Sequence, residues 1–161
     1  MRPLTSKAPT ITRPSDTTAY ANGDLVANST TAGSVTPFKF PVPLYFSIKH
    51  ARLVKSDPTV TNASFRLHIY EDAPTPANGD NSAWSTTVAG YLGWIDLATN
   101  DTFTDDCVLH GIPIHTVEEA ITFPIVGRRG TSGYIYGLLE ALAAYTPASA
   151  ETFSITLSGT Q

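Results

Sequence analysis

Cysteine is almost missing from this chain of 161 residues, because Cys107 is the only one. No intrachain disulfide can form, which excludes the class of small secreted scaffolds held together by disulfides. Charge is also scarce, since Asp, Glu, Lys and Arg make up 15% of the residues, against about 25% in an ordinary soluble domain. Charge depletion is typical of the centres of protein interfaces, so the composition favours a subunit partly covered by neighbours. A threonine-rich sheet that faces water is the alternative.

Long apolar runs and clusters of basic residues are lacking as well. No segment approaches the ~18 uninterrupted apolar residues of a membrane span, and Met1–Lys7 has no apolar stretch behind its basic residues. We therefore expect no membrane partner and synthesis in a cytoplasm. The formal net charge is -4, and scattered Lys and Arg do not form the clusters that neutralise phosphates, so nucleic acid is not an expected partner.

The chain does contain many short apolar runs separated by Pro, Gly, Asn and Asp. At residues 65–69 and 153–157 every second side chain is large and apolar, which is the period of a half-buried strand. About eight such runs follow one another without alternating helices, and the length is that of one domain. These features predict an all-β fold, an antiparallel β-sandwich of the jelly-roll-like kind.

Residues 1–36 differ in composition from the rest of the chain. They are rich in Thr, Ala, Ser and Asn, and several prolines exclude helix there. The Asn22–Gly23 pair is a strong turn signal between two short apolar runs. We therefore predict an extended N-terminal arm with a short hairpin over residues 1–36, followed by a β-sandwich domain over residues 37–161. Removal of Met1–Asn28 is then expected to leave a folded domain.

Three segments support more specific predictions. A short turn separates the apolar runs at residues 133–145 and 152–158, so we expect the chain to end as a β-hairpin. The parity of the apolar residues changes near Lys49–His50, which predicts a β-bulge or a strand break. Turn residues dominate residues 71–90, which predicts a long loop. Trp84 near its end must be buried against a partner or against the sheet of this chain.

Some residues of the sequence carry groups that can bind metal ions, but each has a simpler structural role. His110 and His115, with Asp105 and Asp106 upstream, carry groups that bind divalent cations. Their spacing suits no recognised site, so a solvated loop is favoured. Residues 78–81 (Asn-Gly-Asp-Asn) hold oxygen ligands of the Ca²⁺ type but lack the later bidentate Glu of an EF-hand, so a turn is favoured.

Catalytic patterns are equally weak. Cys107 follows Asp106, whereas a reactive thiolate needs electropositive surroundings, so a buried structural thiol is expected. The sequence contains no nucleophile elbow, phosphate-binding glycine loop or paired carboxylate motif. The chain is therefore expected to be non-enzymatic, with no cofactor and no metal.

Aromatic side chains are the other route to function, because Trp and Tyr on a sandwich face stack on sugars or fill pockets of a partner. Trp94 and Tyr91 lie in a predicted strand and are expected in the core. For Trp84, in its loop, the sequence favours neither the core nor the surface. The candidate contacts with a partner are Arg13, Tyr20, Leu25 and Trp84.

Several segments together resemble small virion structural proteins of tailed bacteriophages. They are residues 12–24, residues 65–70 with the Ala-Pro loop and Trp84 that follow, residues 90–97, and the closing apolar runs. The resemblance covers most of the chain. It implies a capsid decoration or cement protein of the virion, bound as an oligomer to the major capsid protein on the outer surface of the capsid. We further hypothesise that several subunits meet about a symmetry axis, with a trimer preferred. It transfers no catalytic residues. A tail or neck component and a carbohydrate-binding β-sandwich module are the alternatives.

Overall fold

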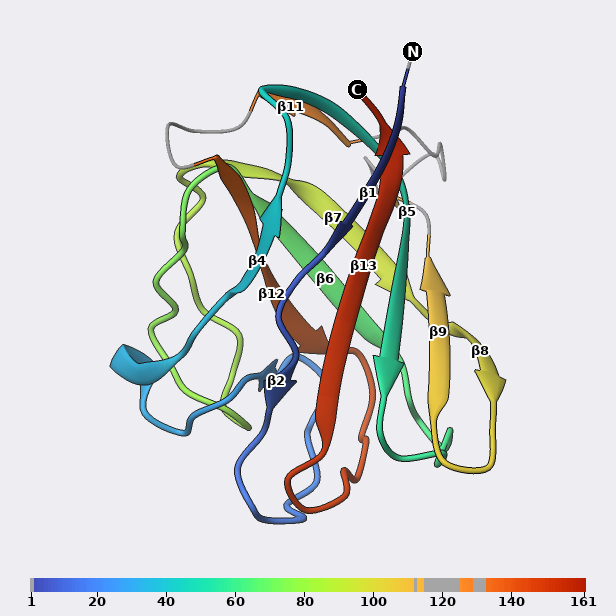
Figure 1. The fold of residues 1–161 in the computed structure, drawn as a ribbon. Coiled ribbons are helices and arrows are strands. Elements are labelled where there is room, and N and C mark those ends of the chain that lie inside the picture. Colours follow the sequence, from blue (N-terminus) through green and yellow to red (C-terminus); the bar gives the residue numbers. More distant parts are fainter. Residues whose placement is uncertain (1, 112, 115–124, 129–132) are drawn as a thin grey trace.

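The computed structural model describes residues 2–111, 113–114, 125–128 and 133–161, and these residues form two antiparallel sheets (Figure 1). The first sheet has the strand order β1-β13-β5-β9-β8, with β11 paired to β5 and β2 paired to β13. The second has the order β10-β7-β6-β12-β3, with β4 paired to β12. The predicted all-β antiparallel sandwich is confirmed.

The strands of the first sheet are β1 (Pro3–Lys7), β2 (Ile11–Thr12), β5 (Tyr45–Lys55), β8 (Thr99–Thr102), β9 (Cys107–Gly111), β11 (Ile125–Arg128) and β13 (Thr152–Thr160). Those of the second sheet are β3 (Leu25–Val26), β4 (Phe38–Pro41), β6 (Phe65–Tyr70), β7 (Tyr91–Leu97), β10 (Pro113–Ile114) and β12 (Tyr134–Ala141). A single turn of 3-10 helix, Ala32–Ser34, is the one helical element of the described ranges. None of those ranges holds a helix with the length and apolar character needed to cross a membrane.

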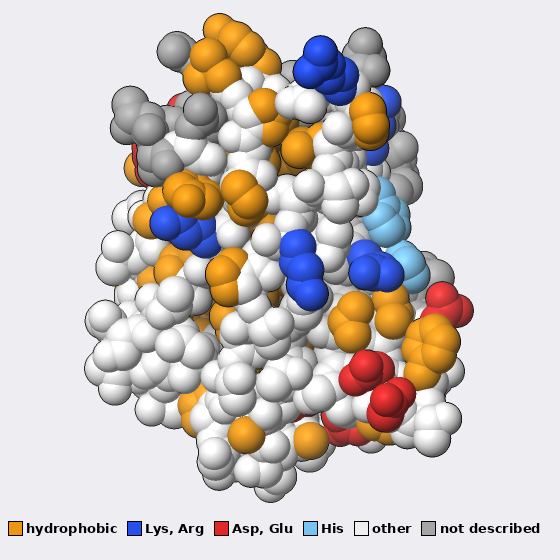
Figure 2. Space-filling view, viewed as in Figure 1, with side chains coloured by type: hydrophobic (Ala, Val, Ile, Leu, Met, Phe, Trp, Pro, Cys, Tyr) orange, Lys and Arg blue, Asp and Glu red, His pale blue; other side chains and the backbone are white. Residues whose placement is uncertain are grey.

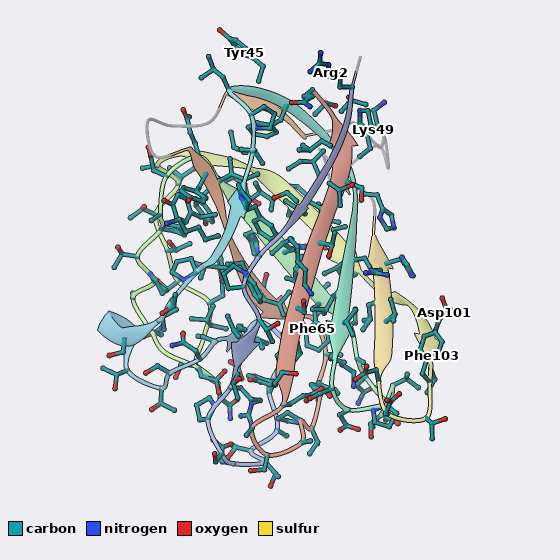
Figure 3. All side chains as sticks on the ribbon, viewed as in Figure 1. Arg2, Tyr45, Lys49, Phe65, Asp101 and Phe103 are labelled. Atoms are coloured by element: carbon teal, nitrogen blue, oxygen red, sulfur yellow. The ribbon has the colours of Figure 1, made fainter. Side chains whose placement is uncertain are left out.

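The core lies between the two sheets, where the inward faces of alternating strands meet. Leu53 of β5 pairs with Ile155 of β13, and both side chains are fully buried. Phe65 and Leu67 of β6, in the opposite sheet, are also fully buried and belong to the same core cluster; Figure 3 labels Phe65 among the side chains. Each fully buried side chain of this size contributes roughly 1.5–3 kcal/mol to folding. The alternation read from the sequence therefore corresponds to the inward and outward faces of real strands.

The prediction of a closing β-hairpin is wrong. Both apolar runs are strands, but β12 lies in the second sheet between β6 and β3, whereas β13 lies in the first sheet between β1 and β5 (Figure 1). The connection from Leu142 to Glu151 therefore crosses from one layer to the other. Alternation identifies a strand and its buried face, but it does not identify the neighbouring strand.

The predicted irregularity near Lys49–His50 is confirmed as a β-bulge. In the pairing of β5 with β13, Ser158 faces His50 while the next residue, Gly159, faces Ile48. Lys49 is the extra residue on β5, and beyond it the buried positions change from even to odd numbers. The bulge thus keeps the apolar residues on both of its sides, Phe46 and Ile48 before it and Ala51 and Leu53 after it, on the inner face of β5.

The first 36 residues are part of the sandwich, so the structure does not support a separate arm that ends at residue 36. β1 and β2 pair with β13 in the first sheet, and β3 pairs with β12 in the second. The predicted hairpin around Asn22–Gly23 is also wrong, because the runs on its two sides pair with different sheets. The turn itself exists, and Gly23 adopts a positive φ of 92° there.

Candidate functional site

Arg13 and Tyr20 lie in a buried polar cluster around Asp80. Arg13 Nη2 is 3.2 Å from Asp80 Oδ2, and the Tyr20 hydroxyl donates to Asp80 Oδ1 at 2.7 Å. The backbone N–H of Ala27 also donates to Asp80 Oδ1, at 2.8 Å, and Arg13 Nε donates to the Tyr20 oxygen at 3.0 Å. Burial raises the pKa of Tyr20, with a further rise from the Asp80 charge, so the phenol stays protonated. The cluster ties the N-terminal segment to the 71–90 loop.

Three of the four residues predicted to contact a partner are buried inside this chain instead. The exposed fraction is 2% for Arg13 and 1% for both Tyr20 and Leu25. Arg13 and Tyr20 have their partners inside this chain, and Leu25 packs in a small apolar cluster with Ala27 and Leu138. These side chains stabilise the fold in this conformation and offer no surface to a second protein.

Trp84 is half-buried, and it packs against the second sheet of its own chain. Its ring stacks on His68, with centroids 4.0 Å apart and planes 17° apart, and it packs on the apolar cluster of Leu25 and Leu138. The Trp84 backbone N–H donates to the Gly23 carbonyl at 2.6 Å, which holds this part of the loop in place. Of the two alternatives for Trp84, burial against its own sheet is the one observed.

His68 is the centre of a polar network on the outer face of the second sheet. Phe65, Leu67 and Ile69 of β6 point into the core, so His68 between them points outward. His68 Nε2 lies 2.8 Å from Glu140 Oε2 of β12, and Nδ1 lies 3.1 Å from the Tyr91 hydroxyl at the start of β7. When Nε2 donates its proton to the carboxylate, Nδ1 accepts one from the phenol.

Arg66 and Trp94 continue the same face beside this network. Arg66 donates to Asp96 through Nε at 2.6 Å and through Nη2 at 3.0 Å, a bidentate pair across β6 and β7. The hydrogen bond to Asp96 raises the pKa of Arg66. Its guanidinium carbon lies 5.3 Å from the centroid of the Trp94 ring. Trp94 and Tyr91 are half-buried on this outer face, so their predicted place in the core is wrong.

A pocket of about 260 Å³ opens beside His68 and Trp84. Tyr70 and Tyr91 line it from the sheet, and residues 86–88 (Thr-Thr-Val) line it from the loop. The two tyrosine rings meet edge to face, with centroids 5.1 Å apart. Burial raises the pKa of both tyrosines, so both phenols remain protonated at neutral pH. The Thr86 hydroxyl is buried, and its polar neighbour is the Tyr70 phenol, which it meets without the geometry of a full hydrogen bond.

This site is not evident from the sequence. Its residues come from β6, the 71–90 loop, β7 and β12, and only the sheet order brings them together. The sequence does place Arg66, His68 and Tyr70 on the outward face of one strand, near a loop that contains an aromatic residue. It does not specify which strands become neighbours of that face.

The other residues considered as metal ligands do not form a metal site within the described ranges. His110 Nδ1 lies 3.1 Å from His50 Nε2, and its Nε2 lies 3.7 Å from Asp101, while the ranges that the structure describes hold no group of three or more metal-ligating side chains. Asp105 is exposed. His115 lies outside the described residues. The turn at residues 78–81 is observed, and its Asp80 carboxylate is occupied by Arg13 and Tyr20.

Cys107 is fully buried, as predicted for a structural thiol. Burial raises the pKa of this thiol, with the Lys55 charge acting in the opposite direction. A raised pKa reduces the thiolate population, so the side chain behaves as a small apolar group in the core.

Comparison with known proteins adds little to this description. No protein-family model matches the chain, and no curated protein matches it. One solved structure, a family two carbohydrate esterase from Cellvibrio japonicus, aligns at 15% identity with a TM-score of 0.19. The alignment covers 98% of this chain and 35% of that one. A TM-score this low does not establish a shared fold, so no inference about this chain follows from it.

Proposed function

We infer that this chain is a non-enzymatic structural protein of a tailed-bacteriophage virion. In this proposal it binds the major capsid protein on the outer surface of the capsid as an oligomer, preferably a trimer, and cements the shell. The resemblance of its segments to such proteins and its low content of charge support this role. In Figure 2 uncharged polar side chains and backbone cover most of the visible face, and charged side chains are scattered over it.

The observation that carries the proposal is an exposed apolar pair where β4 leads into β5. Leu44 is 41% exposed and Tyr45 is 65% exposed, and Figure 3 shows Tyr45 projecting from one end of the sandwich, at the same end as Arg2. Tyrosine is one of the side chains that dominate the binding free energy of protein interfaces when it fills a pocket of the partner. This end of the molecule takes the place of the buried N-terminal residues as the proposed contact surface.

Cementing follows from binding alone, without any chemical step. A protein that binds the assembled shell and not its separated subunits stabilises the shell by mass action. An oligomer that holds neighbouring capsid subunits at once adds the effect of several linked contacts. Expansion or dissociation of the shell must then break all of these contacts together.

A cryo-EM map of the particle that carries this protein tests the proposal, with its copies counted against the major capsid protein. Hundreds of copies on the capsid lattice are expected, and light scattering of the purified protein is expected to give the mass of a trimer. A ring of few copies at the neck or tail would assign the protein to that alternative. Absence from the particle would overturn the proposal.

Two variants test the contact surface itself. Tyr45→Ser is expected to lower occupancy on stripped particles by about tenfold or more, because it removes an apolar anchor. Val88→Ser is the matched control, since Val88 is 83% exposed but lies in the 71–90 loop. Equal occupancy of the two variants in a co-sedimentation assay would contradict the assignment of this surface.

A further inference from the structure

We propose that the pocket beside His68 and Trp84 binds a single neutral pyranose sugar, such as the terminal residue of a glycan. This role is separate from the capsid contact and rests on different residues. The pocket is open at the surface of the second sheet, and it is lined by aromatic rings and hydroxyl groups together.

The size of the pocket limits the ligand to one small ring. Its volume of about 260 Å³ lies just below the range of roughly 300–1,000 Å³ that holds drug-sized ligands. The rings of Tyr70, Trp84 and Tyr91 give it apolar walls. The C–H faces of a pyranose are apolar and pack on such rings, whereas its hydroxyl groups need donors and acceptors around the edge.

The polar groups of the pocket match a ligand that carries hydroxyls. Thr86 and Thr87 each contribute a hydroxyl, and the Tyr70 phenol stays protonated. The Tyr91 phenol donates its proton to His68, so its oxygen can act only as an acceptor for a ligand. The buried Thr86 hydroxyl lies beside the Tyr70 phenol without the geometry of a full hydrogen bond, and a ligand hydroxyl would give it a better partner. His68 is already held by Glu140 and Tyr91, so its ring is fixed in position before any ligand arrives.

Two other ligand classes fit these residues less well. An anion is disfavoured, because the described lining includes no Lys or Arg and the Glu140 carboxylate lies directly behind His68. A quaternary ammonium ion suits an aromatic cage, but it has no group that can hydrogen-bond to Thr86. In addition, one face of Trp84 is covered by His68 and is not free for a cation.

The test is a titration of the full chain with methyl glycosides of common hexoses and N-acetylhexosamines, followed by tryptophan fluorescence and by amide NMR spectra. A saturable change is expected, with NMR shifts confined to the Trp84 indole N–H and residues 86–91. Trp94→Phe is expected to keep the fluorescence response, because Trp84 is then the reporter. Trp84→Phe is expected to lose it.

The variant Thr86→Val keeps the shape of the side chain and removes the hydroxyl, so a loss of affinity of about tenfold is expected. It decides the question even if Trp84→Phe proves too unstable to test. Wild-type affinity in Thr86→Val, NMR shifts located elsewhere, or no saturable response to any glycoside would overturn the proposal. Saturable binding of tetramethylammonium instead of glycosides would overturn it in favour of a cation cage.

Discussion

At the scale of residues, the most consequential feature is that two basic side chains lie inside the protein and are paired there. Arg13 meets Asp80, and Lys55 Nζ lies 3.4 Å from Glu151 Oε1. The Tyr145 hydroxyl donates to the same Glu151 carboxylate at 2.8 Å. Removing one partner of such a pair leaves an uncompensated buried charge, which is much costlier than losing a surface ion pair. The fold therefore depends on some of the few charged residues of this chain.

Asp80→Ala is expected to lower the free energy of unfolding by about 3–5 kcal/mol, because it leaves the buried Arg13 and Tyr20 without their acceptor. Urea unfolding followed by fluorescence measures this change. Asp16→Ala is the control, since Asp16 also pairs with Arg13 but its side chain is 40% exposed, and only a small effect is expected. Similar midpoints for the two variants would contradict a structural role for the buried pair.

The histidine pair of the first sheet predicts a pH dependence of stability. His50 and His110 lie side by side with ring centroids 5.2 Å apart. Burial lowers the pKa of His50 from its ordinary value of 6.5, and the nearby charges of His110 and Arg52 lower it further. Asp101, 3.7 Å from His110, is the acidic group that faces the pair. Below pH 6.5 the unfolded chain binds more protons than the folded one, so stability falls as the pH decreases.

His50→Gln is therefore expected to weaken the loss of stability between pH 6.5 and the lowered pKa of the folded protein. Thermal denaturation at a series of pH values measures this for the wild type and the variant. Parallel curves for the two proteins would show that His50 does not cause the pH dependence.

At the scale of elements, strand pairing depends on close backbone approaches that single glycines permit. Gly159 of β13 lies opposite the bulge in β5, and a Cβ atom there would lie 1.8 Å from the Ser47 carbonyl oxygen. The neighbour is backbone in a central strand pair, so it has little freedom to move. The bulge predicted from the parity change at Lys49 thus requires a specific small residue on the partner strand.

Gly159→Ala is expected to destabilise the protein by about 1–3 kcal/mol through overpacking at the bulge. Gly33→Ala is the matched control, because a Cβ atom at Gly33 would meet no atom within 4 Å. Differential scanning calorimetry compares the two. A melting temperature for Gly159→Ala equal to that of Gly33→Ala would contradict the close approach.

At the scale of the whole molecule, the N-terminal segment contributes strands to both sheets. β1 lies along β13, and Arg2 and Gln161 exchange backbone hydrogen bonds of 3.1 and 2.9 Å (Figure 1). β3 extends the second sheet from the same segment, and the Arg13–Asp80 pair fixes the stretch between them. The N-terminal residues are thus as much a part of the sandwich as the C-terminal strand.

Contrary to the prediction from the sequence, we therefore expect that the chain does not fold without residues Met1–Asn28. Without them β13 loses β1 and β2, β12 loses β3, and Asp80 loses Arg13 and Tyr20. The truncated chain is expected to lack cooperative thermal unfolding and dispersed amide NMR signals, in contrast to the full chain. A truncated protein that unfolds cooperatively would restore the view of these residues as an arm.

The sequence by itself determined the class of fold, because alternation at residues 65–69 and 153–157 records which face of each strand is buried, and that is a local property. The bulge at Lys49 was predictable for the same reason. The burial of Cys107 was predicted on other grounds, because the adjacent Asp106 disfavours a reactive thiolate. Only the tertiary structure decided that β12 and β13 lie in different sheets, that Arg13 and Tyr20 are buried, and that His68, Trp84 and Tyr91 meet beside one pocket. These facts depend on which distant strands become neighbours, and a pattern with a period of two residues does not contain that choice.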